Sequence, residues 1–246
     1  MINPDILPYR NIHEGETAIF FLTGPSLLSF DKNQIPDYDN ITKFSVNKIY
    51  NYDSHLGPID YYCYGDVRDE QQYVNQVNDY KVSKDKFALC GETWSVCHNF
   101  KKGTYESKVD IIMANWEYQT KEYMKVDIAT NYLYQGVSTC FPAMVLILYM
   151  GFKTIYLIGA DCKWEKGSWG WQMNEEVDPV ICGGKMPRID CLLQGWRDLK
   201  DVACKNRKDT KIISVNPVGL KGIMHEDIEA RLETPVKPRG LWISGH

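Results

Sequence analysis

The residues best suited to chemistry are small, amide, hydroxyl and acidic ones that follow short apolar segments. They are Gly24, Pro25 and Ser26; Asn47; Gly65 and Asp66; Asn115; Gly159, Ala160 and Asp161; and Asn216 and Pro217. Hydroxyls and amides can bind a phosphate or a sugar, and carboxylates can hold Mg²⁺ or accept a proton. Each position alone predicts only a turn, because these residue types end strands in most proteins. The set as a whole predicts a single binding cleft.

The turn formed by Gly24, Pro25 and Ser26, with Thr23 before it, has the clearest physical role. Gly24 lets the backbone approach a ligand closely, Pro25 stiffens the turn and Ser26 offers a hydroxyl. A helix or helical turn after it, beginning at LLSFDKNQI, would present free N–H groups to a phosphate. The turn matches neither the Walker motif nor the dinucleotide-binding fingerprint, so it does not identify a ligand by itself.

Alternating strands and helices would bring these residues together. Apolar, β-branched and aromatic runs predict strands at 18–22, 43–46, 59–64, 86–90, 108–114, 154–161 and 211–215. A buried helix is predicted at 138–150, with Ser138 and Thr139 as N-cap residue types, and an amphipathic helix at 189–204. This order predicts an α/β fold with a mainly parallel sheet.

The segment 162–188 follows the longest strand run and has no clean period. It is rich in glycine and contains Trp164, Trp169 and Trp171. A long segment of this kind inside a domain is typical of a lid over a site, and three tryptophans argue against plain disorder. We therefore predict one domain, residues 1–246, with a lid-like insertion at 162–188. Within it Glu165 is a candidate base, although a solvated carboxylate is the ordinary reading.

The composition sets limits on partners. The chain has 246 residues, of which 44% are apolar, and a formal net charge of −4. It is long enough to build a full core, and its charge gives no electrostatic reason to expect nucleic acid as a partner. The aromatic fraction of 13% is high. Aromatic surface suits a sugar or a base as a ligand and equally a subunit interface, so a homo-oligomer is one expectation.

The chain shows no targeting signal in its first residues, which lack a basic region followed by an apolar one. Its longest apolar run, at 140–150, is about half of the ~20 residues that a membrane span needs. The 8 cysteines form no CxxC pair and match no zinc pattern. We expect reduced thiols and a cytoplasmic location, with a peripheral position at the inner face of the membrane as an alternative.

Several segments together resemble a known family. TGPSLLSFD, KFSVNKIYNYD, DYYCYGDVRD and QGVSTCFPAMVLILYMGFKTIYLIGADCKW occur in the order seen in the bacterial family 42 sialyltransferases. They are also similar to the related domain of archaeal 6-hydroxymethylpterin diphosphokinases. The resemblance covers roughly residues 18–66 and 136–220. It implies a Rossmann-like three-layer fold that binds a nucleotide.

The resemblance also implies roles for individual residues. Gly24, Ser26 and Asn47 would contact a CMP-type nucleotide, together with the adjoining Thr23 and Pro25. Ser138 and Thr139 would lie near the phosphate and sugar of the donor. Asp66 and Asp161 would stand in the same cleft, and in the diphosphokinase branch they would hold Mg²⁺ with the nucleotide phosphates.

One departure from the family concerns the general base. The sialyltransferases use a histidine in the lid, whereas residues 162–190 here contain none. The catalytic residue is therefore unassigned, with Asp161 and Glu165 as candidates. Trp164, Trp169 and Trp171 would close over the substrate.

Three functions remain open from the sequence. The first is a sialyltransferase-like glycosyltransferase that needs no cofactor and moves a sugar from a nucleotide donor to a small acceptor, in the synthesis of a glycan such as lipopolysaccharide. The second is a diphosphokinase that acts on a pterin-like substrate with ATP and Mg²⁺. The third is a non-catalytic protein that binds a nucleotide or a sugar.

Overall fold

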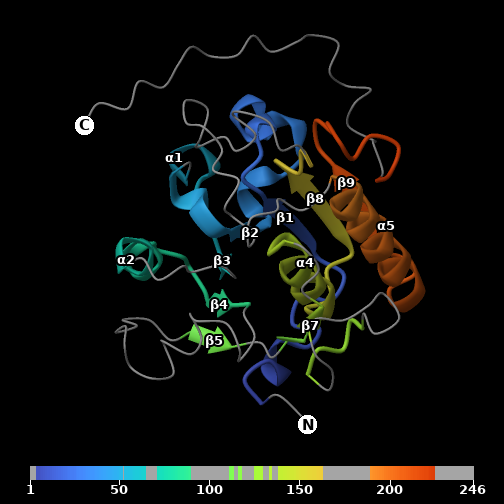
Figure 1. Ribbon diagram of the computed structural model, residues 1–246, viewed down its shortest axis with the longest axis horizontal. Coiled ribbons are helices and arrows are strands. Elements are labelled where there is room, and N and C mark those ends of the chain that lie inside the picture. Colours follow the sequence, from blue (N-terminus) through green and yellow to red (C-terminus); the bar gives the residue numbers. More distant parts are fainter. Residues whose placement is uncertain are drawn as a thin grey trace.

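The computed structural model describes residues 4–51, 53–64, 71–89, 111–113, 116–117, 125–129, 133–134, 138–162 and 189–224. Seven strands in this part of the chain form one sheet in the order β5-β4-β3-β2-β1-β8-β9, and β6 pairs with β7 separately. The strands are β1 Thr17–Phe21, β2 Thr42–Val46, β3 Tyr61–Tyr64, β4 Lys86–Ala88, β5 Ile111–Met113, β6 Trp116–Glu117, β7 Leu133–Tyr134, β8 Thr154–Ile158 and β9 Lys211–Ser214. Every pairing is parallel, which confirms the predicted α/β class (Figure 1).

The helices agree with the apolar periodicity of the sequence. The α-helices are α1 Asp53–Leu56, α2 Gln71–Asp79, α4 Cys140–Tyr149 and α5 Ile189–Asn206. Short 3-10 helices are η1 Leu7–Tyr9, η2 Pro25–Ser29, η3 Lys32–Gln34, η4 Tyr38–Asn40 and η5 Asn47–Asn51. The two predicted helices, at 138–150 and 189–204, are confirmed as α4 and α5. Every residue of α4 is buried, as an apolar surface on all sides requires.

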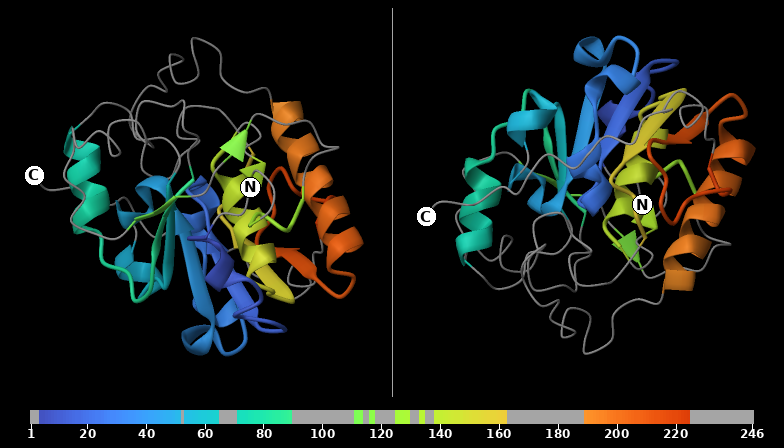
Figure 2. Two further views of the ribbon diagram at one scale, coloured as in Figure 1. Left: turned by 90° about the horizontal axis from the view of Figure 1, so that it is seen from below. Right: turned by 90° about the horizontal axis from the view of Figure 1, so that it is seen from above.

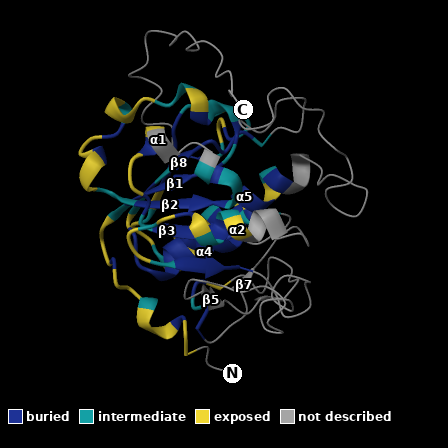
Figure 3. Ribbon diagram, turned by 90° about the vertical axis from the view of Figure 1, so that its left-hand side faces the viewer, coloured by how far each residue is buried: buried dark blue, intermediate teal, exposed yellow. Residues whose placement is uncertain are grey.

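The sheet is covered on both faces, which gives three layers. In β1, Ala18 and Phe20 belong to one core cluster, while Ile19 and Phe21 belong to the other. The alternation follows from the two-residue period of a strand. The first cluster packs against α4 and α5, and the second against α2 and the 3-10 helices. Figure 2 shows α5 on one side of the sheet and α2 on the other, and Figure 3 shows the strands buried between the layers.

The strand order reverses at β1. The chain passes from β1 outward through β2, β3, β4 and β5, and then returns to the opposite side of β1 with β8 and β9. The point between β1 and β8 is the topological switch point, where open parallel sheets bind ligands beyond the carboxyl ends of their strands. Because α4 runs antiparallel to β8, the start of α4 lies at this carboxyl edge.

The amino edge of the sheet is closed by the residues before β1. The N–H of His13 donates to the carbonyl of Met150 at 2.9 Å, and that of Asn11 donates to Tyr149 at 3.1 Å. Arg207, just beyond α5, donates to Glu14 at 2.9 Å. These contacts fix the first segment against the ends of both long helices. Of the helices in the described ranges, none has the length and apolar character needed to cross a membrane.

Candidate nucleotide site at the switch point

The ends of β1 and β8 meet backbone to backbone. The N–H of Leu22 donates to Ile158 at 2.8 Å, and that of Gly24 donates to Gly159 at 2.9 Å. A Cβ on Gly24 would lie 2.4 Å from the carbonyl oxygen of Gly159, and a Cβ on Gly159 would lie 2.3 Å from that of Leu22. Gly159 also has a φ of +77°, which favours glycine. Both glycines are therefore required by the contact between the two strand ends.

Asp161 connects the two turns through its side chain. One carboxylate oxygen accepts the N–H of Ser26 at 2.8 Å, and the other accepts a hydrogen bond from the Ser26 hydroxyl. The carboxylate is buried, and the backbone carbonyl of Asp161 accepts the N–H of Gly219 at 3.1 Å. A single residue thus joins the turns after β1, β8 and β9. We call this contact the Ser26–Asp161 brace.

Because of the brace, fewer hydrogen-bond donors of the turn after β1 are available to a ligand. The helical turn predicted there is the five-residue 3-10 helix η2. Its first N–H groups have protein partners, since Ser26 donates to Asp161 and Leu27 donates to Gly24 at 3.0 Å. The expectation that these N–H groups are free for a phosphate is therefore wrong. The physical reason is twofold: the close approach of the β8 turn supplies the Asp161 carboxylate, and the tight 3-10 turn supplies the Gly24 carbonyl.

Asn47 lies directly after β2, at the start of η5. Its φ of 49° is in the left-handed region, where asparagine is among the few tolerated residues apart from glycine. The backbone carbonyl accepts a hydrogen bond from the Tyr62 hydroxyl at 2.6 Å. The side-chain oxygen Oδ1 is buried and has no hydrogen-bond partner in the described part of the chain. A buried acceptor of this kind needs a donor from outside the described residues, such as a water or a ligand.

The start of α4 supplies the hydroxyls at the predicted positions, but they do not cap the helix. Thr139 is the N-cap residue, with φ −56° and ψ −23°, and its side chain makes no capping hydrogen bond. A capping side chain normally needs an extended backbone at this position, which corrects the predicted N-cap role of Ser138 and Thr139. The ten-residue helix presents the positive end of its dipole here, and that end favours an anion.

Two cysteines show that this helix start lies beside the end of β8. Burial raises the pKa of Cys140 to about 12, while a hydrogen bond with Ser138 lowers it and the nearby Cys162 thiol raises it further. Burial likewise raises the pKa of Cys162 to about 12, against a hydrogen bond with Trp196. Protonated, buried thiols such as these are poor nucleophiles. We assign them to packing between α4, α5 and the β8 turn.

Positive φ angles occur at both edges of the sheet, for example at Asn11, Gly15 and Gly151 before strands β1 and β8. At the carboxyl edge they include those of four residues that follow strands. Cys162 has a φ of 51° and Asn216, after β9, a φ of 52°, in addition to those of Asn47 and Gly159. Asn216 is held by Gln34, with amide contacts of 3.0 and 3.3 Å. Asn216 stood at a predicted strand exit, whereas nothing in the sequence pointed to its partner Gln34.

The structure places most of the predicted site residues together. Thr23, Gly24, Pro25, Ser26, Asn47, Ser138, Thr139 and Asp161 all lie at the carboxyl edge. Asp66, Trp164, Glu165, Trp169 and Trp171 lie outside the described residues, as does the predicted lid apart from Cys162. The described residues contain no group of three His, Cys, Asp or Glu side chains that could hold a metal ion. The roles of all these residues toward a ligand stay predictions.

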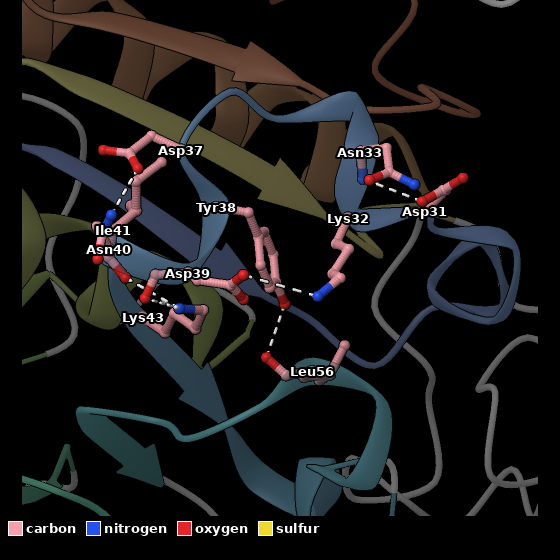
Figure 4. A network of polar contacts seen from close by, with 10 residues as sticks. All are labelled: Asp31, Lys32, Asn33, Asp37, Tyr38, Asp39, Asn40, Ile41, Lys43 and Leu56. Carbon is pink, nitrogen blue, oxygen red and sulfur yellow. Dashed lines mark hydrogen bonds and ion pairs between the residues drawn. The ribbon is translucent and has the colours of Figure 1, made fainter.

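A cavity of about 260 Å³ lies at the opposite edge of the sheet, next to the starts of β2 and β3. Two carboxylates line the cavity. Asp60 accepts the N–H of Lys43 at 2.9 Å and the Ser83 hydroxyl at 2.6 Å, and Asp39 pairs with Lys32 at 3.7 Å. The Lys43 amine donates to the Ile41 carbonyl at 3.2 Å and lies over the Tyr38 ring (Figure 4). Because these polar groups have protein partners, we place the site at the carboxyl edge and not here.

No family model matches the chain, and no curated protein matches it in sequence. Solved structures do share its fold. The Campylobacter jejuni sialyltransferase CstII, in complex with the substrate analogue cytidine-5'-monophosphate, has a TM-score of 0.55 at 18% identity, over 86% of this chain and 85% of that one. Another CstII structure, holding a trisaccharide acceptor and CMP, has a TM-score of 0.52 at 18% identity, over 85% of both chains.

Two further proteins extend the comparison. The monofunctional α-2,3-sialyltransferase Cst-I from Campylobacter jejuni has a TM-score of 0.51 at 20% identity, over 88% of this chain and 78% of that one. The MAf glycosyltransferase from Magnetospirillum magneticum AMB-1 has a TM-score of 0.51 at 14% identity, over 94% of this chain and 41% of that one. The chain therefore has a glycosyltransferase-type fold. More narrowly, it is the fold of the Campylobacter sialyltransferases.

Proposed function

We propose that this protein is a sialyltransferase-like glycosyltransferase that moves a sugar from a CMP-type nucleotide donor to a small acceptor. The product would be a glycan such as lipopolysaccharide, made in the cytoplasm. The observation that carries the proposal is the arrangement at the switch point. There the Ser26–Asp161 brace joins the ends of β1 and β8, on a fold shared with a CMP-bound sialyltransferase.

The geometry suggests how the residues divide the work. The turn from Thr23 to Ser26, together with Asn47, would hold the nucleoside. The N-terminus of α4 would stabilise the leaving phosphate through the positive end of its dipole and the hydroxyls of Ser138 and Thr139, because the Phe141 and Ala143 N–H groups already donate to carbonyls of the helix start. The acceptor hydroxyl would attack the anomeric carbon while the bond from sugar to phosphate breaks. The phosphate oxygen then takes the electron pair, and the proton of the acceptor passes to a base that we leave unassigned.

We propose that the reaction requires no metal ion. Both oxygens of the Asp161 carboxylate accept hydrogen bonds from Ser26, which supports a role in shaping the turn rather than in holding Mg²⁺. The alternative, a diphosphokinase with a pterin-like substrate, needs Asp66 and Asp161 as ligands of the metal. Dependence on Mg²⁺ therefore separates the two functions.

The first test is the melting temperature with CMP, UDP, GDP or ATP, each with Mg²⁺ or with EDTA. We expect CMP to raise it in EDTA. A ligand at 100 times its Kd adds about 2.7 kcal/mol to the free energy of unfolding, which corresponds to roughly 5–10 °C for a chain of this size. No shift with any nucleotide at millimolar concentration would overturn the proposal.

The same measurements distinguish the alternatives. A shift with ATP that requires Mg²⁺ and is absent in EDTA would identify the diphosphokinase. A shift with CMP in a protein that neither transfers nor hydrolyses the sugar of CMP-sialic acid would identify a non-catalytic binding protein.

A further inference from the structure

Tyr62 belongs to β3 and is completely buried, yet its hydroxyl hydrogen-bonds to the residue that follows the neighbouring strand β2. The hydroxyl donates to the backbone carbonyl of Asn47 at 2.6 Å. The ring is fixed by two neighbours: Tyr80 packs edge-on with a centroid distance of 5.0 Å, and Tyr64 stacks at 5.9 Å. A hydroxyl on a ring held in this way has one position. It therefore fixes the carbonyl that it contacts.

The carbonyl that Tyr62 contacts belongs to Asn47, whose backbone conformation is unfavourable unless contacts hold it. Asn47 has a φ of 49°, and Lys48 after it departs from helical geometry with ψ 25°. Left-handed residues other than glycine persist only where the surroundings hold them. Without the hydrogen bond from Tyr62, the peptide that follows Asn47 could turn toward a more favourable conformation. The Asn47 side chain would move with it.

The Asn47 side chain has an unsatisfied polar atom. Its Oδ1 is buried, and no donor in the described residues reaches it. A ligand with an N–H or O–H group would satisfy it. Ribose hydroxyls and the amino group of cytosine are such donors, whereas a fully ionised phosphate is not.

We infer that Tyr62 is a positioning residue for the nucleotide: it holds Asn47 in the left-handed conformation, so that Oδ1 accepts a hydrogen bond from the nucleoside. The inference rests on the proposed function, because it assumes that the ligand is a nucleotide. Tyr62 itself does not contact the ligand and acts only through Asn47.

The test is the Kd for CMP of Tyr62→Phe, measured by calorimetry. We expect binding about fivefold weaker, the factor that corresponds to one lost hydrogen bond. The matched control is Tyr38→Phe, because the buried Tyr38 hydroxyl also donates to a backbone carbonyl, that of Leu56, at 2.7 Å (Figure 4). The control should lose similar thermal stability and keep the Kd of the wild type. Equal weakening in both variants would overturn the inference.

A double-mutant cycle tests the route through Asn47. In the Asn47→Ala background, Tyr62→Phe should change the Kd by less than about twofold, because the side chain that it positions is gone. An undiminished fivefold effect in that background would show that Tyr62 acts by another route.

The failure of the proposed function would be visible separately, as wild-type protein that does not bind CMP. Amide hydrogen exchange of residues 47–51 then decides the structural part of the inference. Faster exchange in Tyr62→Phe but not in Tyr38→Phe supports the restraint on Asn47. Unchanged exchange in both variants overturns it.

Discussion

His13 and Asn47, one at each edge of the sheet, differ in how their buried polar atoms are satisfied. At the amino edge, His13 has protein partners: it contacts Glu16 at 2.8 Å and the Tyr61 hydroxyl at 2.9 Å, and its ring stacks on Phe152 at 4.6 Å. At the carboxyl edge, the backbone of Asn47 is in the left-handed region and its Oδ1 lacks a partner in the described chain.

From this difference we infer that the amino edge contributes mainly to the stability of the fold and that the carboxyl edge binds the ligand. Satisfied buried polar groups and stacked rings stabilise the fold. Left-handed residues occur at both edges, at Asn11 and at Asn47, so the unsatisfied acceptor Oδ1 of Asn47 is the feature that points to a ligand. Mutations at the amino edge should therefore change stability alone, whereas those at the carboxyl edge should also change nucleotide affinity.

The largest effect is expected from Gly159→Ala, at the contact between β1 and β8. The new methyl group would lie 2.3 Å from the Leu22 carbonyl oxygen, on a backbone with φ +77°. We expect the free energy of unfolding to fall by about 3 kcal/mol, measured by urea denaturation, and CMP binding to be lost with it.

Gly57→Ala is the matched control for this overlap. Gly57 also has a positive φ, +71°, but a Cβ there meets nothing within 4 Å. Only the conformational cost of about 1 kcal/mol should remain, and CMP affinity should be unchanged. A similar loss of stability in both variants would contradict the tight contact between the two strand ends.

The second prediction concerns the amino edge. His13→Ala removes the stacked ring and leaves the buried Tyr61 hydroxyl without its partner. We expect a loss of about 2–3 kcal/mol in the free energy of unfolding. The Kd for CMP, measured where the variant is folded, should equal that of the wild type. A weaker Kd would show that the two edges are coupled and would break the comparison.

Tyr61→Phe separates the two contributions of His13. It removes the hydroxyl that contacts the imidazole but keeps the ring, which stacks on Phe44 at 4.7 Å. The expected loss is about 1 kcal/mol, clearly less than that of His13→Ala.

Much of the fold could be predicted from the sequence because burial imposes a pattern. The core strands β1 and β8 are continuous apolar runs, and α4 is apolar on every side. Helix α2 was not predicted, because QQYVNQVND is mostly polar, although its apolar residues Tyr73, Val74 and Val77 are at helical spacing. Its place depends on tertiary contacts such as that of the Lys86 amine, which donates to the Val77 carbonyl at 2.6 Å.

The site was predictable in its location but not in its contacts. Ser26 and Asp161 both stood at strand ends, yet nothing in the sequence paired residues that are 135 positions apart. Gly24 was expected to let the backbone approach a ligand closely. The structure shows instead that the missing Cβ leaves room for the carbonyl of Gly159. Tyr62 gave no signal, because an aromatic residue in an apolar strand normally only packs.

At the contact between β1 and β8, the smaller effect, and the one that tests the brace itself, is expected from Ser26→Ala. This variant removes the hydroxyl bond to Asp161 but keeps the bond from the backbone N–H. Hydrogen bonds to a charged group contribute more than neutral ones, so we expect a loss of about 1.5 kcal/mol in stability and weaker CMP binding. Ser29→Ala is the control: its hydroxyl donates to the Ser26 carbonyl at 2.9 Å in the same 3-10 helix. If the two variants bind CMP equally well, the turn does not need Asp161 to hold its shape, and the carboxyl edge is less strictly arranged than the hydrogen bonds indicate.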